Sequence, residues 1–101
     1  LPFGQGRLLE IARAMAVRPS IMLMDEPAAG LNNRETAQLA VLIRKIRSTG
    51  VTVVLVEHDM ELVMDICDRI IVLNLGRKLA EGTPREIQEN KAVISAYLGE
   101  G

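Results

Sequence analysis

Apolar positions along the chain switch between the spacing of helices and the short runs that are typical of buried strands. Residues 8–15 and 39–46 carry apolar side chains three and four positions apart, which predicts two amphipathic helices. Residues 21–25 and 51–56 are short and mainly apolar, which predicts two strands of a parallel sheet, buried on both faces. The first half of the chain therefore alternates predicted helices and strands.

The second half of the chain carries the signals of a short helix, a hairpin and a further helix. Residues 62–67 have helical apolar spacing, and the strand-like runs 69–74 and 77–81 flank the turn Leu75-Gly76. Thr83-Pro84-Arg85-Glu86 combines an N-cap, a proline at the first helical position and a capping-box glutamate. A helix is therefore predicted to begin at this segment.

The order of these elements predicts the α/β class. Gly4-Gln5-Gly6 is a predicted turn before the first helix. Asn32 and Glu35 have capping-box spacing before the second helix, which Gly50 ends.

Helices between successive strands imply right-handed crossovers. We expect a mostly parallel sheet with helices on its faces, followed by a C-terminal β-hairpin and helices, in one domain of residues 1–101.

Composition and charge exclude several classes of function. A formal net charge of −1 offers no basic surface to a polyanion, so nucleic acid is not expected as a partner. Cys67 is the single cysteine, which excludes an intrachain disulfide and fits a reducing compartment. No apolar stretch approaches the ~18 residues that cross a bilayer, so any membrane link must run through another subunit.

Two acids and a histidine follow the predicted strands. Asp25 and Glu26 end the first strand, and His58 comes just after the second. Because parallel strands present their carboxyl ends at one rim, where such sheets bind ligands, these side chains should lie together. Asp25 suits a magnesium ion, which prefers oxygen ligands, and Glu26 can orient or deprotonate an attacking water. By themselves, acids at a strand end and a lone histidine are more often structural.

Four segments, taken together, resemble the motifs of the ATP-binding-cassette (ABC) ATPases. Leu1-Pro2-Phe3-Gly4-Gln5 is similar to their signature loop, Ile21 to Glu26 to their Walker B strand, Ala28 to Asn32 to their D-loop, and His58 to their switch histidine. The resemblance covers essentially the whole chain and implies part of a P-loop NTPase fold. It also implies ATP and Mg²⁺ as cofactors, with Asp25 serving the metal, Glu26 as the catalytic glutamate and His58 contacting the γ-phosphate.

The phosphate-cradling motif of that fold is missing from the sequence. A Walker A loop ends in Gly-Lys-Ser or Gly-Lys-Thr, and none of the three lysines, Lys45, Lys78 and Lys91, follows a glycine. Leu1 also falls inside the signature motif. The chain is therefore expected to be the carboxyl-terminal portion of a longer ATPase subunit that lacks the Walker A half. By itself it should be inactive, and it should self-associate through the surfaces that the other half would cover.

Two motifs depart from the common ABC pattern. Pro2 stands where a serine usually offers a hydroxyl and a backbone N–H to the nucleotide of a second ATPase subunit. Gly4 and Gln5, near a helix amino terminus, can still meet an anion through free N–H groups. Asn32 stands where the D-loop usually ends in aspartate. Either an action across a dimer seam or a plain N-cap explains Asn32.

A narrower resemblance is to the ATP-binding subunits of branched-chain amino acid importers. It rests on the segments 28–32, 56–61, 80–84 and 97–100. The resemblance implies a fragment of an importer subunit that binds and hydrolyses ATP and works with transmembrane permease subunits. The parent subunit would be cytoplasmic and peripheral to the inner face of the cell membrane.

Two other classes of protein stay open. A non-transport ABC ATPase or an exporter subunit shares the core motifs. A receiver-type signalling or binding domain is also a small α/β unit with an acidic strand end, but it should carry a lysine at the end of a late strand. Lys78 instead begins a predicted strand, which counts against this class.

Overall fold

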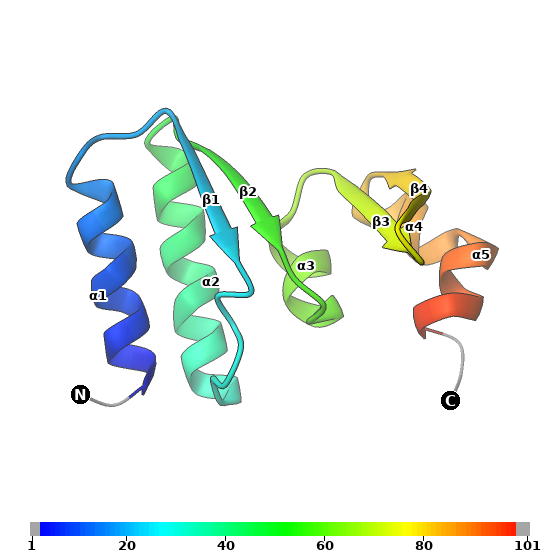
Figure 1. The fold of residues 1–101 in the computed structure, drawn as a ribbon, viewed down its shortest axis with the longest axis horizontal. Helices are drawn as coiled ribbons and strands as arrows, with labels where there is room; N and C mark the ends of the chain where they lie inside the picture. The colour runs from blue at the N-terminus through cyan, green and yellow to red at the C-terminus, as the bar shows by residue number, and fades with distance from the viewer. Residues whose placement is uncertain (1–2, 99–101) are drawn as a thin grey trace. The chain divides into compact units, whose positions relative to one another are not determined.

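A computed structural model of the protein describes residues 3–98. The elements in Figure 1 are α1 (Phe3–Met15), β1 (Ile21–Asp25), α2 (Asn33–Ser48), β2 (Thr52–Val56), α3 (Met60–Ile66), β3 (Ile70–Asn74), β4 (Arg77–Gly82), α4 (Pro84–Glu89), α5 (Lys91–Val93) and a π-helical turn at Ile94–Leu98. They form two compact units that meet in the sequence at Leu62 and Val63. Helices occur together with a parallel strand pair and an antiparallel strand pair. This mixture confirms the predicted α/β class. Within residues 3–98, no helix is long and apolar enough to cross a membrane.

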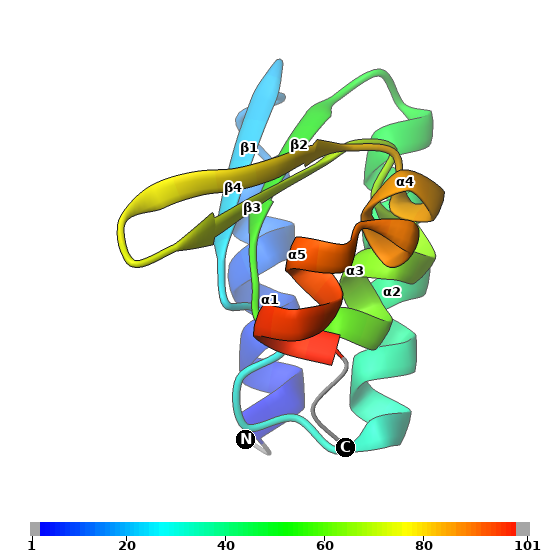
Figure 2. The same cartoon turned by 90° about the vertical axis from the view of Figure 1, so that its right-hand side faces the viewer.

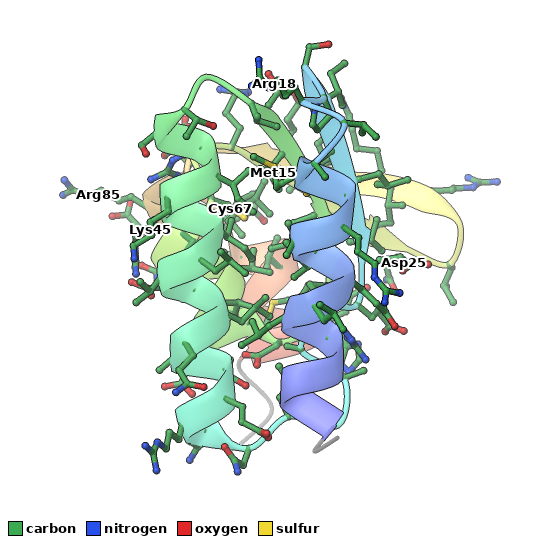
Figure 3. All side chains as sticks on the ribbon, turned by 90° about the vertical axis from the view of Figure 1, so that its left-hand side faces the viewer. Met15, Arg18, Asp25, Lys45, Cys67 and Arg85 are labelled. Atoms are coloured by element: carbon green, nitrogen blue, oxygen red, sulfur yellow. The ribbon has the colours of Figure 1, made fainter. Side chains whose placement is uncertain are left out.

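The first unit is built on β1 and β2, which pair in parallel along their whole length and are connected through α2. Figure 3 shows α1 and α2 side by side on one face of this pair. Met22 and Met24 of β1 are buried, and so are Leu39 and Ile43 of α2. The core of this unit therefore lies between the two helices and one face of the strands, as the helical and strand patterns predict.

The opposite face of the β1–β2 pair is exposed. Its apolar side chains Ile21, Leu23, Val54 and Val56 are between 46% and 67% exposed. The prediction that these strands are buried on both faces is wrong for the described residues, because the helices of this unit cover a single face. Strands of parallel sheets carry apolar side chains on both faces when a layer covers each face. The exposed side of β1 and β2 is thus an apolar surface without such a layer in this unit.

α1 begins earlier than the sequence predicts. Gly4-Gln5-Gly6 lies inside the helix rather than in a turn before it. The N–H groups of a first helical turn have no intrahelical partner, so glycines disturb fewer hydrogen bonds here than in the helix middle. The other end agrees with the prediction, since α1 stops at Met15. The chain then reaches Pro19 through Arg18, which has a left-handed conformation with φ of 51°.

The start of α2 has the capping box that the sequence predicts. The Asn32 Oδ1 accepts a hydrogen bond from the Glu35 N–H at 2.8 Å, and the Glu35 Oε1 accepts one from the Asn32 N–H at 3.0 Å. Gly50 follows the helix with a φ of 96°, a conformation that glycine adopts without strain. The cap fixes where α2 begins, and therefore how long the loop between β1 and α2 is.

The second unit holds the predicted hairpin of β3 and β4 and the helices that follow it, with α4 and α5 packed against β4. Figure 2 shows the hairpin and the two helices. Leu75 and Gly76 both have positive φ, as a two-residue type I′ turn requires. The predicted capping box opens α4, and hydrogen bonds from the Thr83 backbone and side chain hold the pKa of Glu86 below its usual value. The Tyr97 hydroxyl donates to the Leu73 carbonyl.

Candidate functional site

The carboxyl ends of β1 and β2 lie at one rim of the parallel pair. Asp25 is the last residue of β1 and pairs with Val56, the last residue of β2. The Glu26 N–H donates to the Val56 carbonyl at 2.7 Å, which extends the pairing by one residue. The segments that begin at Glu26 and Glu57 therefore leave the strands side by side, as the sequence predicts.

Glu26 and His58 are in direct contact at this rim. The His58 Nδ1 lies 2.7 Å from the Glu26 Oε1. The two side chains remain accessible, with exposed fractions of 79% for His58 and 49% for Glu26. A carboxylate held by an imidazole and open to solvent can orient a water and accept its proton.

The backbone of Glu26 has a conformation that the sequence does not predict. Its φ is 47°, in the left-handed region that residues with a side chain rarely adopt and that costs roughly 1–2 kcal/mol. Hydrogen bonds fix the residue on both sides, because its N–H donates to Val56 and its carbonyl accepts from the Ala29 N–H at 3.1 Å. Such strain persists where the surroundings over-determine it, and it clusters at functional sites.

Asp25 offers a hard oxygen ligand beside an open cleft. It is exposed at the end of β1, where Figure 3 labels it. The cleft measures about 690 Å³, and its lining includes Arg7 and Glu10 from α1 and Asp25 and Glu26 from the strand end. No three His, Cys, Asp or Glu side chains gather as a metal site anywhere in residues 3–98. Mg²⁺ is commonly held by one or two carboxylates together with substrate phosphates, so the donors present fit this ion.

Glu57 connects the two loops of the rim. Its Oε2 accepts a hydrogen bond from the Ala28 N–H at 2.9 Å, and its Oε1 accepts one from the His58 N–H at 3.1 Å. Asp59, on the other side of His58, caps the next helix, since its Oδ1 accepts from the Leu62 N–H at 3.1 Å. Glu57 instead holds the loop after β1 next to His58.

Arg7 of α1 holds the same loop from the other side. Its Nη1 donates to the carbonyls of Glu26 at 3.1 Å and Pro27 at 2.5 Å, and its Nη2 lies 3.5 Å from the Ala29 carbonyl. Sequence reasoning missed the contacts of Arg7 and Glu57 with this loop. Their partners are backbone groups 19 to 29 positions away, and backbone groups leave no signal in a residue pattern.

The remaining candidate residues are placed only in part. Gly4 and Gln5 lie in the first turn of α1, near a helix amino terminus as predicted. Pro2 lies outside the described residues. Asn32 acts as the N-cap of α2, which confirms the plainer of its two predicted roles. Any contact of Asn32 across a dimer seam stays a prediction.

Comparison with known proteins gives a consistent set of similarities. The family described as "Branched-chain amino acid ATP-binding cassette transporter" matches residues 77–101. The high-affinity branched-chain amino acid transport ATP-binding protein BraF of Pseudomonas aeruginosa is 59% identical over 101 residues, which cover 99% of this chain. The corresponding protein LivG of Escherichia coli K12 is 54% identical over the same share of the chain. The chain spans about 40% of the length of both relatives.

A solved structure has the same fold. The ADP conformation of MJ1267, an ATP-binding cassette of an ABC transporter, superposes with a TM-score of 0.86 at 29% identity. The superposition covers 99% of this chain and 41% of MJ1267. The fold of the described residues and the sequence similarity of the chain therefore point to the same family.

Proposed function

Because the chain belongs to the ABC ATP-binding proteins and is 54–59% identical to those of branched-chain amino acid transport, we propose that it is part of the ATP-hydrolysing subunit of an importer for branched-chain amino acids. The observation that carries the proposal is the 2.7 Å contact between Glu26 and His58 at the carboxyl ends of two parallel strands. Similarity to transport proteins supports the cargo class, and the contact at the rim supports Glu26 and His58 as residues that act on ATP.

The proposed chemistry is the in-line attack of water on the γ-phosphate of ATP. A Glu26 oxygen accepts a hydrogen bond from the water and orients it, while His58 holds Glu26 and contacts the γ-phosphate. Asp25 is the carboxylate available to a Mg²⁺ ion, which neutralises phosphate charge when it is bound. The left-handed backbone of Glu26 supports this assignment, because it is a strained position that several hydrogen bonds maintain.

The proposed partners are a second ATPase subunit and transmembrane permease subunits. Gly4 and Gln5 in the first turn of α1 would offer N–H groups to the nucleotide of the second subunit, and Asn32 would face the same seam. The permease subunits would place the complex at the cytoplasmic side of the cell membrane. The apolar open face of β1 and β2 supports the need for a further protein layer.

A hybrid protein tests the proposed function. In this hybrid, the chain replaces the matching part of BraF, a relative at 59% identity. We expect the hybrid to hydrolyse ATP and to restore leucine and valine uptake to cells that lack BraF. The same hybrid with Glu26→Gln is the control and should restore neither. A hybrid that folds and assembles but restores neither activity would contradict the proposal.

The chain by itself should have no ATPase activity and negligible affinity for Mg-ATP. The reason is that its sequence has no Gly-Lys-Ser or Gly-Lys-Thr to hold the phosphates. Isothermal titration of the 101-residue chain with Mg-ATP checks this, with the hybrid as the positive control. Submicromolar binding to the chain would refute the prediction.

The chain by itself should also self-associate. The apolar face formed by Ile21, Leu23, Val54 and Val56 is exposed, and β1 and β2 each have an unpaired edge within their two-stranded pair. Light scattering should give a mass above the monomer's 11.1 kDa that rises with concentration. Leu23→Lys with Val54→Lys places charge on this face and should shift the mass toward the monomer. A monodisperse monomer of the unchanged chain at high concentration would refute the prediction.

The two alternative classes are less well supported. The family and both relatives carry branched-chain amino acid transport in their names, which favours an importer over an exporter or a non-transport ATPase. For a receiver-type domain the required lysine is missing from a strand end. Lys78 lies near the start of β4, where its Nζ donates to the Glu81 Oε1 at 2.9 Å and helps to hold the pKa of Glu81 below its usual value. Stable labelling of Asp25 by a phosphoryl donor would reverse this ranking.

A further inference from the structure

The loop between β1 and α2 is held on two sides by charged side chains. Arg7 of α1 donates to the carbonyls of Glu26 and Pro27, and Glu57 accepts from the Ala28 N–H. Pro27 and Ala28 are buried between these contacts. The loop is therefore fixed at several consecutive peptide groups, beginning with the one that follows Glu26.

These contacts decide the direction of the Glu26 side chain. With φ at 47°, the Glu26 side chain leaves the backbone in a direction that an extended residue would not give it. Loss of Arg7 would remove one of the two donors to the Glu26 carbonyl and the Arg7 donor to the Pro27 carbonyl, which would allow these peptide planes to rotate and the strain to relax. The Glu26 carboxylate would then move away from His58, which lies 2.7 Å from it.

We infer that Arg7 is a positioning residue for Glu26. It keeps the backbone of Glu26 in the left-handed conformation and so holds the carboxylate where it meets His58 and the attacking water. This inference rests on the proposed function, because it assigns Arg7 a role in the same hydrolysis reaction. It adds a residue of α1 to the parts of the chain that determine the rate.

The chemistry of arginine suits this role. Its guanidinium presents five N–H donors in a rigid plane, so one side chain serves several carbonyls at once. A lysine ammonium is a single point of charge and holds fewer of these oxygens in place. Arg13 is the matched control, because it lies on the same helix, is exposed and lies outside the cleft beside Glu26.

Steady-state ATP hydrolysis by the hybrid measures the effect. Arg7→Met should lower kcat about tenfold and leave the KM for ATP within about twofold, because a displaced catalytic group slows the reaction without weakening nucleotide binding. Arg7→Lys should recover part of the rate, and Arg13→Met should leave it unchanged. Thermal melting of each variant shows whether a rate loss comes from unfolding.

A second background separates positioning from general damage to the fold. If Arg7 acts through Glu26, Arg7→Met should cause no further loss of rate in a hybrid that already carries Glu26→Gln. An equal loss in both backgrounds would overturn the inference. An unchanged kcat in the Arg7→Met hybrid would also overturn the inference, provided that Glu26→Gln abolishes the activity of the hybrid. The proposed function would survive both of these results. Full activity of Glu26→Gln itself would instead refute the proposed function.

Nuclear magnetic resonance of the hybrid decides the inference without any hydrolysis. The amide-to-α-proton coupling and the Cα shift of Glu26 report its φ. Arg7→Met should move both away from left-handed values, and Arg13→Met should not. Unchanged values for Arg7→Met would overturn the inference even if the hybrid proved inactive.

Discussion

Replacing Glu26 with glutamine in the hybrid is expected to lower kcat for ATP hydrolysis by about 10²–10⁴-fold, the usual contribution of a general base. The glutamine keeps the size of the side chain and can still bond to His58, but it cannot take a proton from water. Nucleotide binding should stay intact, since Glu26 acts on the water. A coupled assay for released phosphate, with a parallel titration of Mg-ATP, measures both quantities.

Glu10→Gln is the control for this variant. Glu10 lines the same cleft from α1 and carries the same charge, but it is not in the proposed chemistry. Its loss should change kcat little. Equal losses for the two variants would mean that the charge of the cleft, rather than the base at Glu26, limits the rate.

Replacing His58 with alanine is expected to lower kcat by about 10²-fold, the size of effect that follows when a reacting group is displaced by about 1 Å. The reason is that Glu26 loses the partner 2.7 Å from its Oε1, and the γ-phosphate loses a contact. His58→Asn should recover part of the rate, because an asparagine amide can place a donor near the position of the imidazole Nδ1. The same phosphate assay checks both variants.

Two results would argue against this role of His58. One is an unchanged kcat in His58→Ala. The other is a rise in the KM for ATP with kcat preserved, which would make His58 a residue of ground-state binding.

Local patterns predict much of the fold because they report local physics. The capping boxes at Asn32 and Thr83 fix helix starts through bonds between residues three positions apart, and the structure has both. The hairpin turn at Leu75-Gly76 is equally local. The meeting of Glu26 and His58 is predictable for a different reason, since parallel strands end at one rim whatever lies between them.

Other features depend on contacts that no local pattern carries. Arg7 and Glu57 bind backbone groups of a distant loop. The left-handed backbone of Glu26 is held by hydrogen bonds with Val56, Ala29 and Arg7, and its residue type does not predict it. The exposed face of β1 and β2 has a similar explanation. An apolar strand shows that a covering layer is expected, but its sequence does not say which part of a protein supplies that layer.

A double-mutant cycle in the hybrid tests most directly whether Glu26 and His58 act as one unit. Catalytic groups that act together lose little more when both are removed than when the more important one is removed. We therefore expect Glu26→Gln with His58→Ala to have a kcat close to that of Glu26→Gln alone. A loss in the double variant equal to the product of the two single losses would contradict joint action at this rim.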